Sequence, residues 1–168
     1  MADDKIGPWT KVNSKNVYEN PWIKVEHNEV LNPNGGEGIY GKVHFKNLAI
    51  GVVPIDSEGF TYLVGQHRFP IDQNSWEIPE GGGALDTDPI ESGKRELLEE
   101  TGLVAAKFEK ILEMHLSNSV SDEIAFIYLA TNLTQKEAEP EETEQLKIKK
   151  VALKTAIKMA MNGEITDA

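Results

Sequence analysis

The stretch WEIPEGGGALDTDPIESGKRELLEETGL, residues 76–103, is the part of the chain that decides the fold. Its second half predicts a helix, because Asp88 can serve as the N-cap, Pro89 suits the first helical position and Glu91 completes a capping box. Gly102 supplies the left-handed backbone position that commonly ends a helix. The residues predicted to face inward are Ile90, Leu97, Leu98 and Thr101.

Three carboxylates gather near the end of this predicted helix. Glu96 and Glu100 are one helical turn apart, and Glu99 lies between them. Like charges at this spacing cost about 0.2–0.5 kcal/mol per pair, and the negative end of the helix dipole adds to that cost. A cation would offset it, and oxygen ligands of this kind favour Mg²⁺, with Mn²⁺ as a substitute. The alternative interpretation is a solvated acidic helix face.

A run of glycines precedes the helix. Gly81-Gly82-Gly83 predicts a Gly-rich loop opposite the carboxylates. Mg²⁺ is usually held by one or two carboxylates together with the phosphates of a substrate. A Gly-rich loop facing a carboxylate-bearing helix is therefore a suitable site for the complex of a metal ion with a diphosphate.

These residues resemble a known motif. Gly81, five residues, Thr87, seven residues and then RELLEETGL at 95–103 resemble the Nudix box of the Nudix hydrolases, in which Glu usually stands in place of Thr87. By this resemblance Arg95 would orient the carboxylates, and it can pair with Glu99 one turn on; a plain surface salt bridge is the alternative. The implied metal ligands are Glu96 and Glu100 directly, Glu99 directly or through water, and the carbonyl of Glu80 or Gly81.

Two segments before the box resemble one branch of the family. GQHRFP at 65–70, predicted to leave the edge of the sheet, and SWEIPEG at 75–81 are similar to the branch that acts on ADP-ribose and nucleoside diphosphate sugars. In that branch Arg68 would face the diphosphate, with a surface arginine as the alternative. Glu77 would lie near the metal or the substrate, and Trp76 is a further candidate for substrate binding.

A second acidic candidate follows the box. Predicted strands at 107–116 and 123–131 are joined by the polar loop SNSVSD. The same branch has a similar Ser-Pro-Gly-x-Ser-Asp-Glu loop whose Glu is a candidate general base; Glu123 matches it, whereas Asn118 and Ser119 replace Pro and Gly. A carboxylate can take a proton from water that a metal ion has acidified. The alternative for Glu123 is a solvated strand start.

The composition bounds the class of protein. With 168 residues, of which 39% are hydrophobic and 27% charged, the chain is long enough for a globular domain and is not expected to be disordered. The absence of cysteine excludes disulfides and thiol catalysis. A net charge of −11 argues against nucleic acid and anionic membrane partners, and no apolar run reaches the ~20 residues of a membrane span. Without an export signal, a cytoplasmic location is expected unless a leader has been trimmed.

The remaining segments complete the expected fold. Strands at 22–31 and 39–45 are predicted to form a hairpin, and the apolar run at 48–55 predicts a buried strand. The acidic run at 137–144 indicates a solvated loop or, by the family resemblance, a segment near the active-site mouth. Further strands are predicted at 60–64 and 146–153, and a closing helix at 155–162 with Gly163 as its C-cap.

The resemblance implies an α/β/α sandwich with a mixed central sheet over residues 46–160, preceded by a small β unit. We predict two domains: residues 1–46, which would form a homodimer, and residues 47–168, the Nudix hydrolase domain. The predicted reaction is Mg²⁺-dependent hydrolysis of a nucleoside diphosphate sugar, such as ADP-ribose or GDP-mannose, to a nucleoside monophosphate and a sugar phosphate. Two alternatives stay open: a Nudix hydrolase of dinucleoside polyphosphates or nucleoside triphosphates, and a non-catalytic nucleotide-sensing module.

Overall fold

The structure of the chain, a computed structural model, describes residues 4–137 and 146–166. Its backbone contacts divide the chain into two compact units. Unit 1 comprises the chain up to Leu48 together with His115–Ile124. Unit 2 comprises Ala49–Met114 together with the chain from Ala125 onward.

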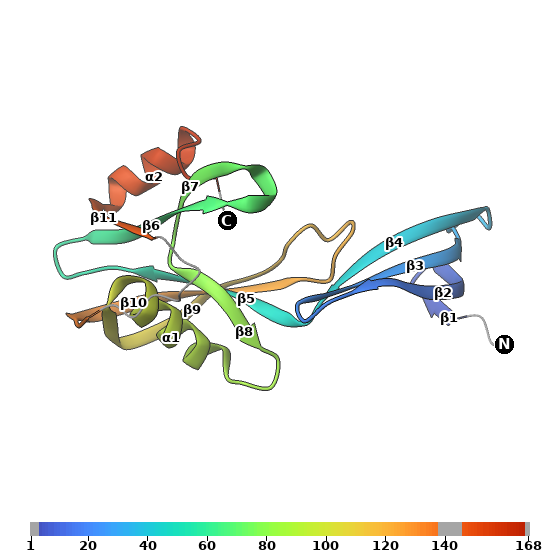
Figure 1. Cartoon of the computed structure of the whole chain (residues 1–168), viewed down its shortest axis with the longest axis horizontal. Helices are drawn as coiled ribbons and strands as arrows, with labels where there is room; N and C mark the ends of the chain where they lie inside the picture. Colours follow the sequence, from blue (N-terminus) through green and yellow to red (C-terminus); the bar gives the residue numbers. More distant parts are fainter. Residues whose placement is uncertain (1–3, 138–145, 167–168) are drawn as a thin grey trace. The chain divides into compact units, whose positions relative to one another are not determined.

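Unit 1 is built on an antiparallel sheet, drawn in blue to cyan in Figure 1. Its strands follow the chain order β1 (Asp4–Ile6), β2 (Trp9–Glu19), β3 (Ile23–Leu31) and β4 (Glu37–Phe45). The register of β3 and β4, with Leu31 opposite Glu37, confirms the predicted hairpin. In its turn Gly35 takes a φ of +83°, which glycine adopts at little cost, and the Asn32 side chain accepts the N–H of Gly36.

Unit 2 contains a mixed sheet in the order β8 (Glu80–Ala84), β5 (Asn47–Pro54), β10 (Ile124–Gln135) and β9 (Leu103–His115). Strands β5 and β10 run parallel, with Ala49 opposite Ala125. Strand β5 is the predicted buried strand, since Ile50 is 1% and Val52 0% exposed. A strand covered on both faces needs apolar residues at consecutive positions, which explains why this run is continuous rather than alternating.

A second, antiparallel sheet has the order β11 (Lys147–Ala152), β6 (Phe60–Arg68) and β7 (Gln73–Glu77). The prediction that residues 65–70 leave the sheet is wrong for the first part of this segment, because β6 continues to Arg68. Strand β7 pairs with β6 up to the pair of Gln73 with Arg68. This pairing provides hydrogen-bond partners for the backbone of β6 up to Arg68 and so extends that strand. The short 3-10 helix η1 (Phe69–Ile71) follows.

Two helices pack on these sheets. Helix α1 (Pro89–Thr101) contacts β8, and helix α2 (Leu153–Met161) contacts β11 and β6 (Figure 1). Ala156 and Met159 of α2 pack against Leu63 of β6. Helix α2 starts earlier than predicted, and Asn162 is its C-cap, with Gly163 next at a φ of +75°. The predicted α/β/α architecture with a mixed sheet is confirmed.

The ends of α1 are those that the sequence predicted. The Asp88 side chain accepts the N–H of Ile90 at 3.0 Å. Gly102 takes a φ of 69° and donates its N–H back into the last turn, to the carbonyl of Leu98 at 2.8 Å. The capping box is not formed as predicted, since the Glu91 carboxylate accepts a hydrogen bond from Lys94 at 2.6 Å.

Among the described residues, no helix has the length and apolar character that a membrane crossing requires. The acidic run predicted at 137–144 lies, beyond Glu137, outside the described residues.

Candidate active site

Helix α1 turns two of its carboxylates toward the protein interior. Glu96 is 7% and Glu100 2% exposed, because residues three and four apart share one side of a helix with the apolar residues that pack inward. This burial excludes the solvated acidic face for these two residues, and each buried carboxylate needs a partner. Of the four residues predicted to face inward, Leu97 and Thr101 are buried and Ile90 and Leu98 are half-buried.

Strand β8 forms the surface on which these carboxylates lie. Gly81–Gly83, predicted as a loop, belong to this strand. A Cβ atom added at Gly81 would overlap the Glu96 carboxylate, so only glycine lets that side chain lie against the backbone. The N–H of Glu80 donates to Oε2 of Glu100 at 3.0 Å. Both buried carboxylates therefore contact the backbone of β8.

Arg95 binds the other acidic side chains of α1. Its Nη1 donates to Glu99 Oε2 at 2.6 Å, which confirms the predicted i,i+4 pair. Its Nη2 donates to a Glu96 carboxylate oxygen and to the carbonyl of Gly82 at 3.1 Å. Burial alone would lower the pKa of Arg95, but the carboxylates of Glu96 and Glu99 outweigh burial and raise it. Arg95 is thus a fixed cation between two of the predicted metal ligands.

A second arginine network lies on β6, β7 and β8. Glu77 is 1% exposed, and its Oε1 accepts a hydrogen bond from Gln66 Nε2 at 2.6 Å. Arg68 Nε donates to Glu77 Oε2 at 3.0 Å, and Arg68 Nη2 pairs with the Glu80 carboxylate. Since Glu80 also donates its backbone N–H to Glu100, it joins this network to the carboxylates of α1.

Gln66 is the member of this network that was not singled out from the sequence. The signal was present, because Gln66 and Arg68 are two residues apart and side chains at that spacing lie on one face of a strand. Recognising it required knowing that the strand continues through these residues, whereas the sequence predicted that they leave the sheet.

Trp76 points away from this network. It neighbours Glu77 on β7, and successive side chains of a strand lie on opposite faces. Its ring packs near Leu63, and the Nζ of Lys149 lies 3.7 Å from the ring centroid. A Cβ atom at Gly65 would meet the same ring at 2.8 Å. The predicted substrate-binding role of Trp76 stays a prediction, on the face of the sheet opposite Glu77.

Glu123 belongs to unit 1, whereas the carboxylates of α1 belong to unit 2. It follows the polar loop that the sequence predicted between the two strands, which are β9 and β10. Its carbonyl accepts the N–H of Leu116 at 3.2 Å. Its role as a general base stays a prediction.

The donor set of unit 2 fits a hard divalent cation. All the side chains predicted as ligands are carboxylates, and Gly81 leaves room for Glu96 at the backbone of β8. In the described part of the chain, no three Asp, Glu, His or Cys side chains already converge as a metal-binding group. Arg95 pairs with Glu96 and Glu99 instead, so binding a metal ion would require these two carboxylates to exchange guanidinium contacts for the ion.

Comparison with known families gives two matches along the chain. Residues 45–165, more than half of the chain, match the model of the NUDIX domain. Residues 9–43 match the model of the nucleoside diphosphate sugar hydrolase N-terminal domain. Together the two matches cover nearly all of unit 2 and most of the sheet of unit 1.

Individual proteins are similar to the chain over most of its length. A Bacillus subtilis (strain 168) protein named ADP-ribose pyrophosphatase is 34% identical over 122 residues, which are 71% of this chain and 66% of that protein. A Bacillus methanolicus protein named methanol dehydrogenase activator is 29% identical over 75% of this chain and 68% of its own length. The chain thus spans about two thirds of these relatives. A crystal structure described as an ADP compounds hydrolase shares the fold, with a TM-score of 0.85 and 19% identity over 98% of this chain and 89% of that one.

Proposed function

The chain belongs to the NUDIX family, and on that basis we propose that it hydrolyses nucleoside diphosphate sugars to a nucleoside monophosphate and a sugar phosphate. The observation that carries the proposal is the buried pair Glu96 and Glu100, received by the backbone of β8. Burying two carboxylates at the negative end of a helix is costly unless cations or hydrogen-bond donors meet them, and a divalent cation would meet both.

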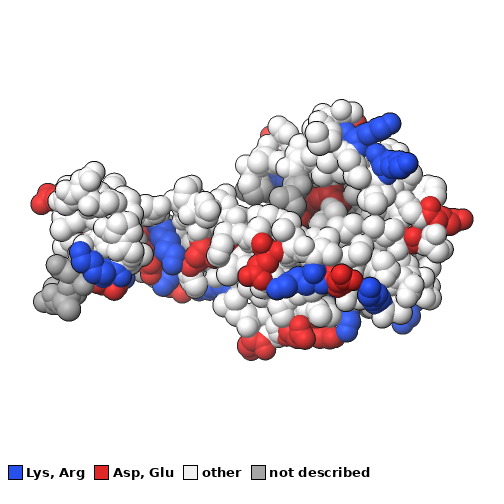
Figure 2. Space-filling model, turned by 180° about the vertical axis from the view of Figure 1, so that it is seen from behind, with Lys and Arg blue, Asp and Glu red and all other residues white. Residues whose placement is uncertain are grey.

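ADP-ribose is the substrate that we propose to test first. The matched N-terminal family is named for nucleoside diphosphate sugar hydrolases, and the B. subtilis relative is named for ADP-ribose. Both names support a nucleotide sugar in preference to a dinucleoside polyphosphate or a nucleoside triphosphate. We expect no nucleic acid partner, because the net charge is −11 and acidic and basic side chains are interspersed on the face shown in Figure 2.

We propose that the divalent metal is Mg²⁺, with Mn²⁺ able to replace it. Glu96, Glu99 and Glu100 would hold it, together with the carbonyl of Glu80 or Gly81. When bound, such an ion supplies positive charge for the diphosphate and acidifies water. The glutamates set where the ion and the diphosphate lie, and Arg95 keeps Glu96 and Glu99 oriented.

Two further residues complete the proposal. Arg68 would contact the diphosphate with a guanidinium that Glu77 and Glu80 already hold in place. Glu123 would take the proton from the attacking water as the general base. Charge that develops on the phosphoryl oxygens in the transition state would then meet a preorganised arginine.

We also propose that residues 1–46 are a domain that forms a homodimer and that residues 47–168 are the hydrolase domain. Apolar side chains exposed on unit 1 support a partner there, among them Val17 at 54% on β2, Ile39 at 71% on β4 and Trp22 at 66% in the turn between β2 and β3. Light scattering should give the mass of two chains, and a Val17→Lys, Ile39→Lys variant should reduce the measured mass to that of one chain.

The cytoplasmic location stays a prediction.

The proposed reaction is tested with a panel of substrates. ADP-ribose, GDP-mannose, ADP-glucose, UDP-glucose, a dinucleoside polyphosphate and dGTP are each incubated with Mg²⁺ and with EDTA. Cleavage of the sugar-linked diphosphates that requires Mg²⁺ is the expected result. Preference for dGTP or the polyphosphate would overturn the substrate class, and binding without any turnover would favour a sensing module.

A further inference from the structure

The loop between β9 and β10 is fastened to strand β4 within unit 1. The N–H of Val43 donates to the carbonyl of Val120 at 2.8 Å, and the N–H of Asp122 donates to the carbonyl of Val43 at 3.2 Å. The Tyr40 hydroxyl donates to the carbonyl of Ser119 at 2.7 Å. The loop therefore continues the sheet of unit 1 beyond β4.

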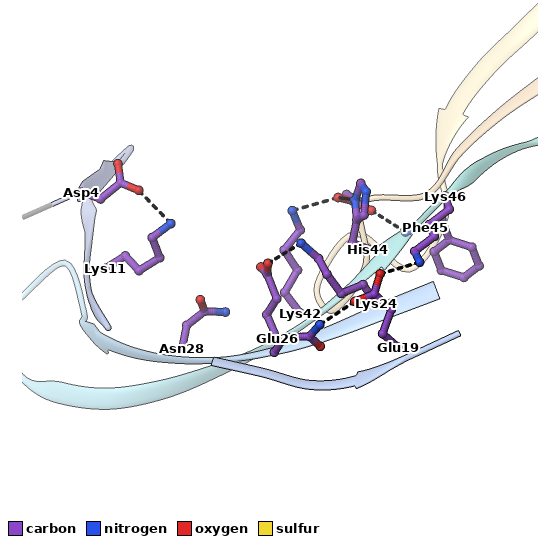
Figure 3. A network of polar contacts seen from close by, with 12 residues as sticks. Asp4, Lys11, Glu19, Lys24, Glu26, Asn28, Lys42, His44, Phe45 and Lys46 are labelled. Carbon is purple, nitrogen blue, oxygen red and sulfur yellow. Dashed lines mark hydrogen bonds and ion pairs between the residues drawn. The ribbon is translucent and has the colours of Figure 1, made fainter. Parts of the chain in front are cut away.

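The Asp122 side chain makes the charged part of this attachment. Its Oδ2 lies 2.7 Å from Nδ1 of His44 and 2.8 Å from Nζ of Lys42, and its Oδ1 accepts the N–H of Phe45 at 3.0 Å. Figure 3 labels Lys42, His44 and Phe45, the three residues that contact Asp122, and dashed lines mark the contacts. Both carboxylate oxygens are used, and all the partners belong to β4.

These contacts keep Asp122 ionised. Burial alone would raise its pKa, but the hydrogen bonds from Lys42, His44 and the Phe45 N–H outweigh burial and lower the pKa to about 2. The hydrogen bonds are charge-assisted, and such bonds are about twice as strong as neutral ones. The attachment of the loop to β4 is therefore present throughout the neutral pH range.

Glu123 is the next residue along the chain. Its carbonyl accepts the N–H of Leu116, the residue that follows β9. Glu123 is therefore held between the end of β9 on one side and the attached Asp122 on the other. A fixed backbone on both sides restricts where its carboxylate can lie.

We infer that Asp122 is a positioning residue that fixes the proposed general base Glu123 through strand β4. The inference rests on the proposed function, in which Glu123 takes a proton. Displacing a reacting group by about 1 Å can cost about 100-fold in rate, so a base benefits from such an attachment. Strand β4 thereby positions the proposed base, in addition to any part in the proposed dimer.

The test is a double-mutant cycle of Asp122→Asn and Glu123→Gln, assayed for kcat and KM with ADP-ribose and Mg²⁺. We expect Glu123→Gln to lower kcat about 100-fold or more. Asp122→Asn should lower kcat about 10-fold, with KM changed by less than about twofold, because the variant displaces the base and leaves substrate binding intact. The double variant should be no slower than Glu123→Gln, since Asp122 acts only through Glu123.

Glu26→Gln is the matched control. Glu26 pairs with Lys24 at 2.8 Å on β3 and has a side chain 25% exposed, against 2.8 Å and 32% for Asp122 with Lys42. Its kcat should equal that of the parent. Amide exchange at Val43 and Asp122 should become faster in Asp122→Asn and stay unchanged in Glu26→Gln. His44→Gln removes one partner and should give a smaller loss of kcat, which keeps the test usable if Asp122→Asn is unstable.

The outcomes separate the inference from the proposed function. The positioning role of Asp122 would be overturned if the losses of kcat in the two single variants multiplied in the double variant, or if Asp122→Asn left kcat unchanged. Either result would leave the assignment of Glu123 as the general base unaffected. Full activity of Glu123→Gln would overturn the base and the positioning role together.

Discussion

Asp122 in unit 1 and the glutamates of unit 2 place carboxyl side chains in two different surroundings. Asp122 pairs with the side chains of Lys42 and His44 and accepts the backbone N–H of Phe45, all from strand β4. In unit 2, Arg68 forms ion pairs with Glu77 and Glu80, and Arg95 forms ion pairs with Glu96 and Glu99. With Glu100, these five glutamates and two arginines carry a formal charge of −3.

The difference indicates which acids hold the structure and which bind a ligand. An acid that pairs with a lysine of its own sheet attaches one segment to another and has no excess negative charge to attract a further ion. A cluster with excess negative charge, partly buried, favours a divalent cation, which then becomes the largest local charge.

The largest effect is expected from the ligands themselves. Glu96→Gln and Glu100→Gln should each lower kcat/KM for ADP-ribose by at least about 100-fold. Replacing a residue that only hydrogen-bonds to a metal ligand already lowers metal affinity or activity about 10–100-fold, and replacing the ligand itself should cost more. Glu91→Gln is the control, since Glu91 lies on the same helix but pairs with Lys94. If the two buried-site variants hydrolyse as fast as the parent, the assignment of the metal ligands is wrong.

Metal binding should stabilise the folded chain. At a Mg²⁺ concentration about 100 times its Kd, we expect the free energy of unfolding to rise by about 2.7 kcal/mol, because the ion binds the folded state alone. Denaturant titrations with Mg²⁺, Mn²⁺ and EDTA measure this change. Glu96→Gln should abolish the increase in unfolding free energy caused by Mg²⁺, and Asp122→Asn should retain it. If both variants lost the increase, Asp122 could not be distinguished from the acids that bind the metal ion.

The glycine beneath Glu96 should tolerate no side chain. Gly81→Ala places a Cβ atom in the position of the Glu96 carboxylate, and we expect it to cost about 2 kcal/mol in unfolding free energy and to lower activity. Gly41→Ala serves as the control, because a Cβ atom there meets nothing within 4 Å. Equal stability of the two variants would contradict the arrangement of β8 against α1.

The smallest effect concerns the pH dependence of Asp122. Its folded pKa of about 2 lies below the ordinary value of 3.8, so its contribution to stability is present above about pH 4 and is lost as the pH falls toward 2. Asp122→Asn should therefore be less stable than the parent by about 1 kcal/mol at pH 7, allowing for the partial exposure of the pair. Urea titrations at pH 7 and pH 2 should show this difference shrinking toward zero in acid.

The local features of the chain were predictable from the amino-acid sequence. The ends of α1 were predictable, since Asp88 caps Ile90 two residues away and Gly102 closes the turn begun at Leu98. The hairpin of β3 and β4 and the continuous apolar strand β5 were predictable for the same reason. The spacing of the glutamates on α1 also follows from the helix repeat, so the family resemblance and the predicted ligands needed no tertiary structure.

Where these side chains lie and what they contact depends on the packing of distant segments. It placed Glu96 against Gly81 and turned Trp76 to the face of the sheet opposite Glu77. Strand β6 continues to Arg68 because strand β7 pairs with it in antiparallel orientation. The residues of β6 alone do not specify this pairing. Asp122 meets His44 across 78 residues. A helix cap depends on atoms a few bonds apart, whereas these contacts exist only after distant segments have packed together.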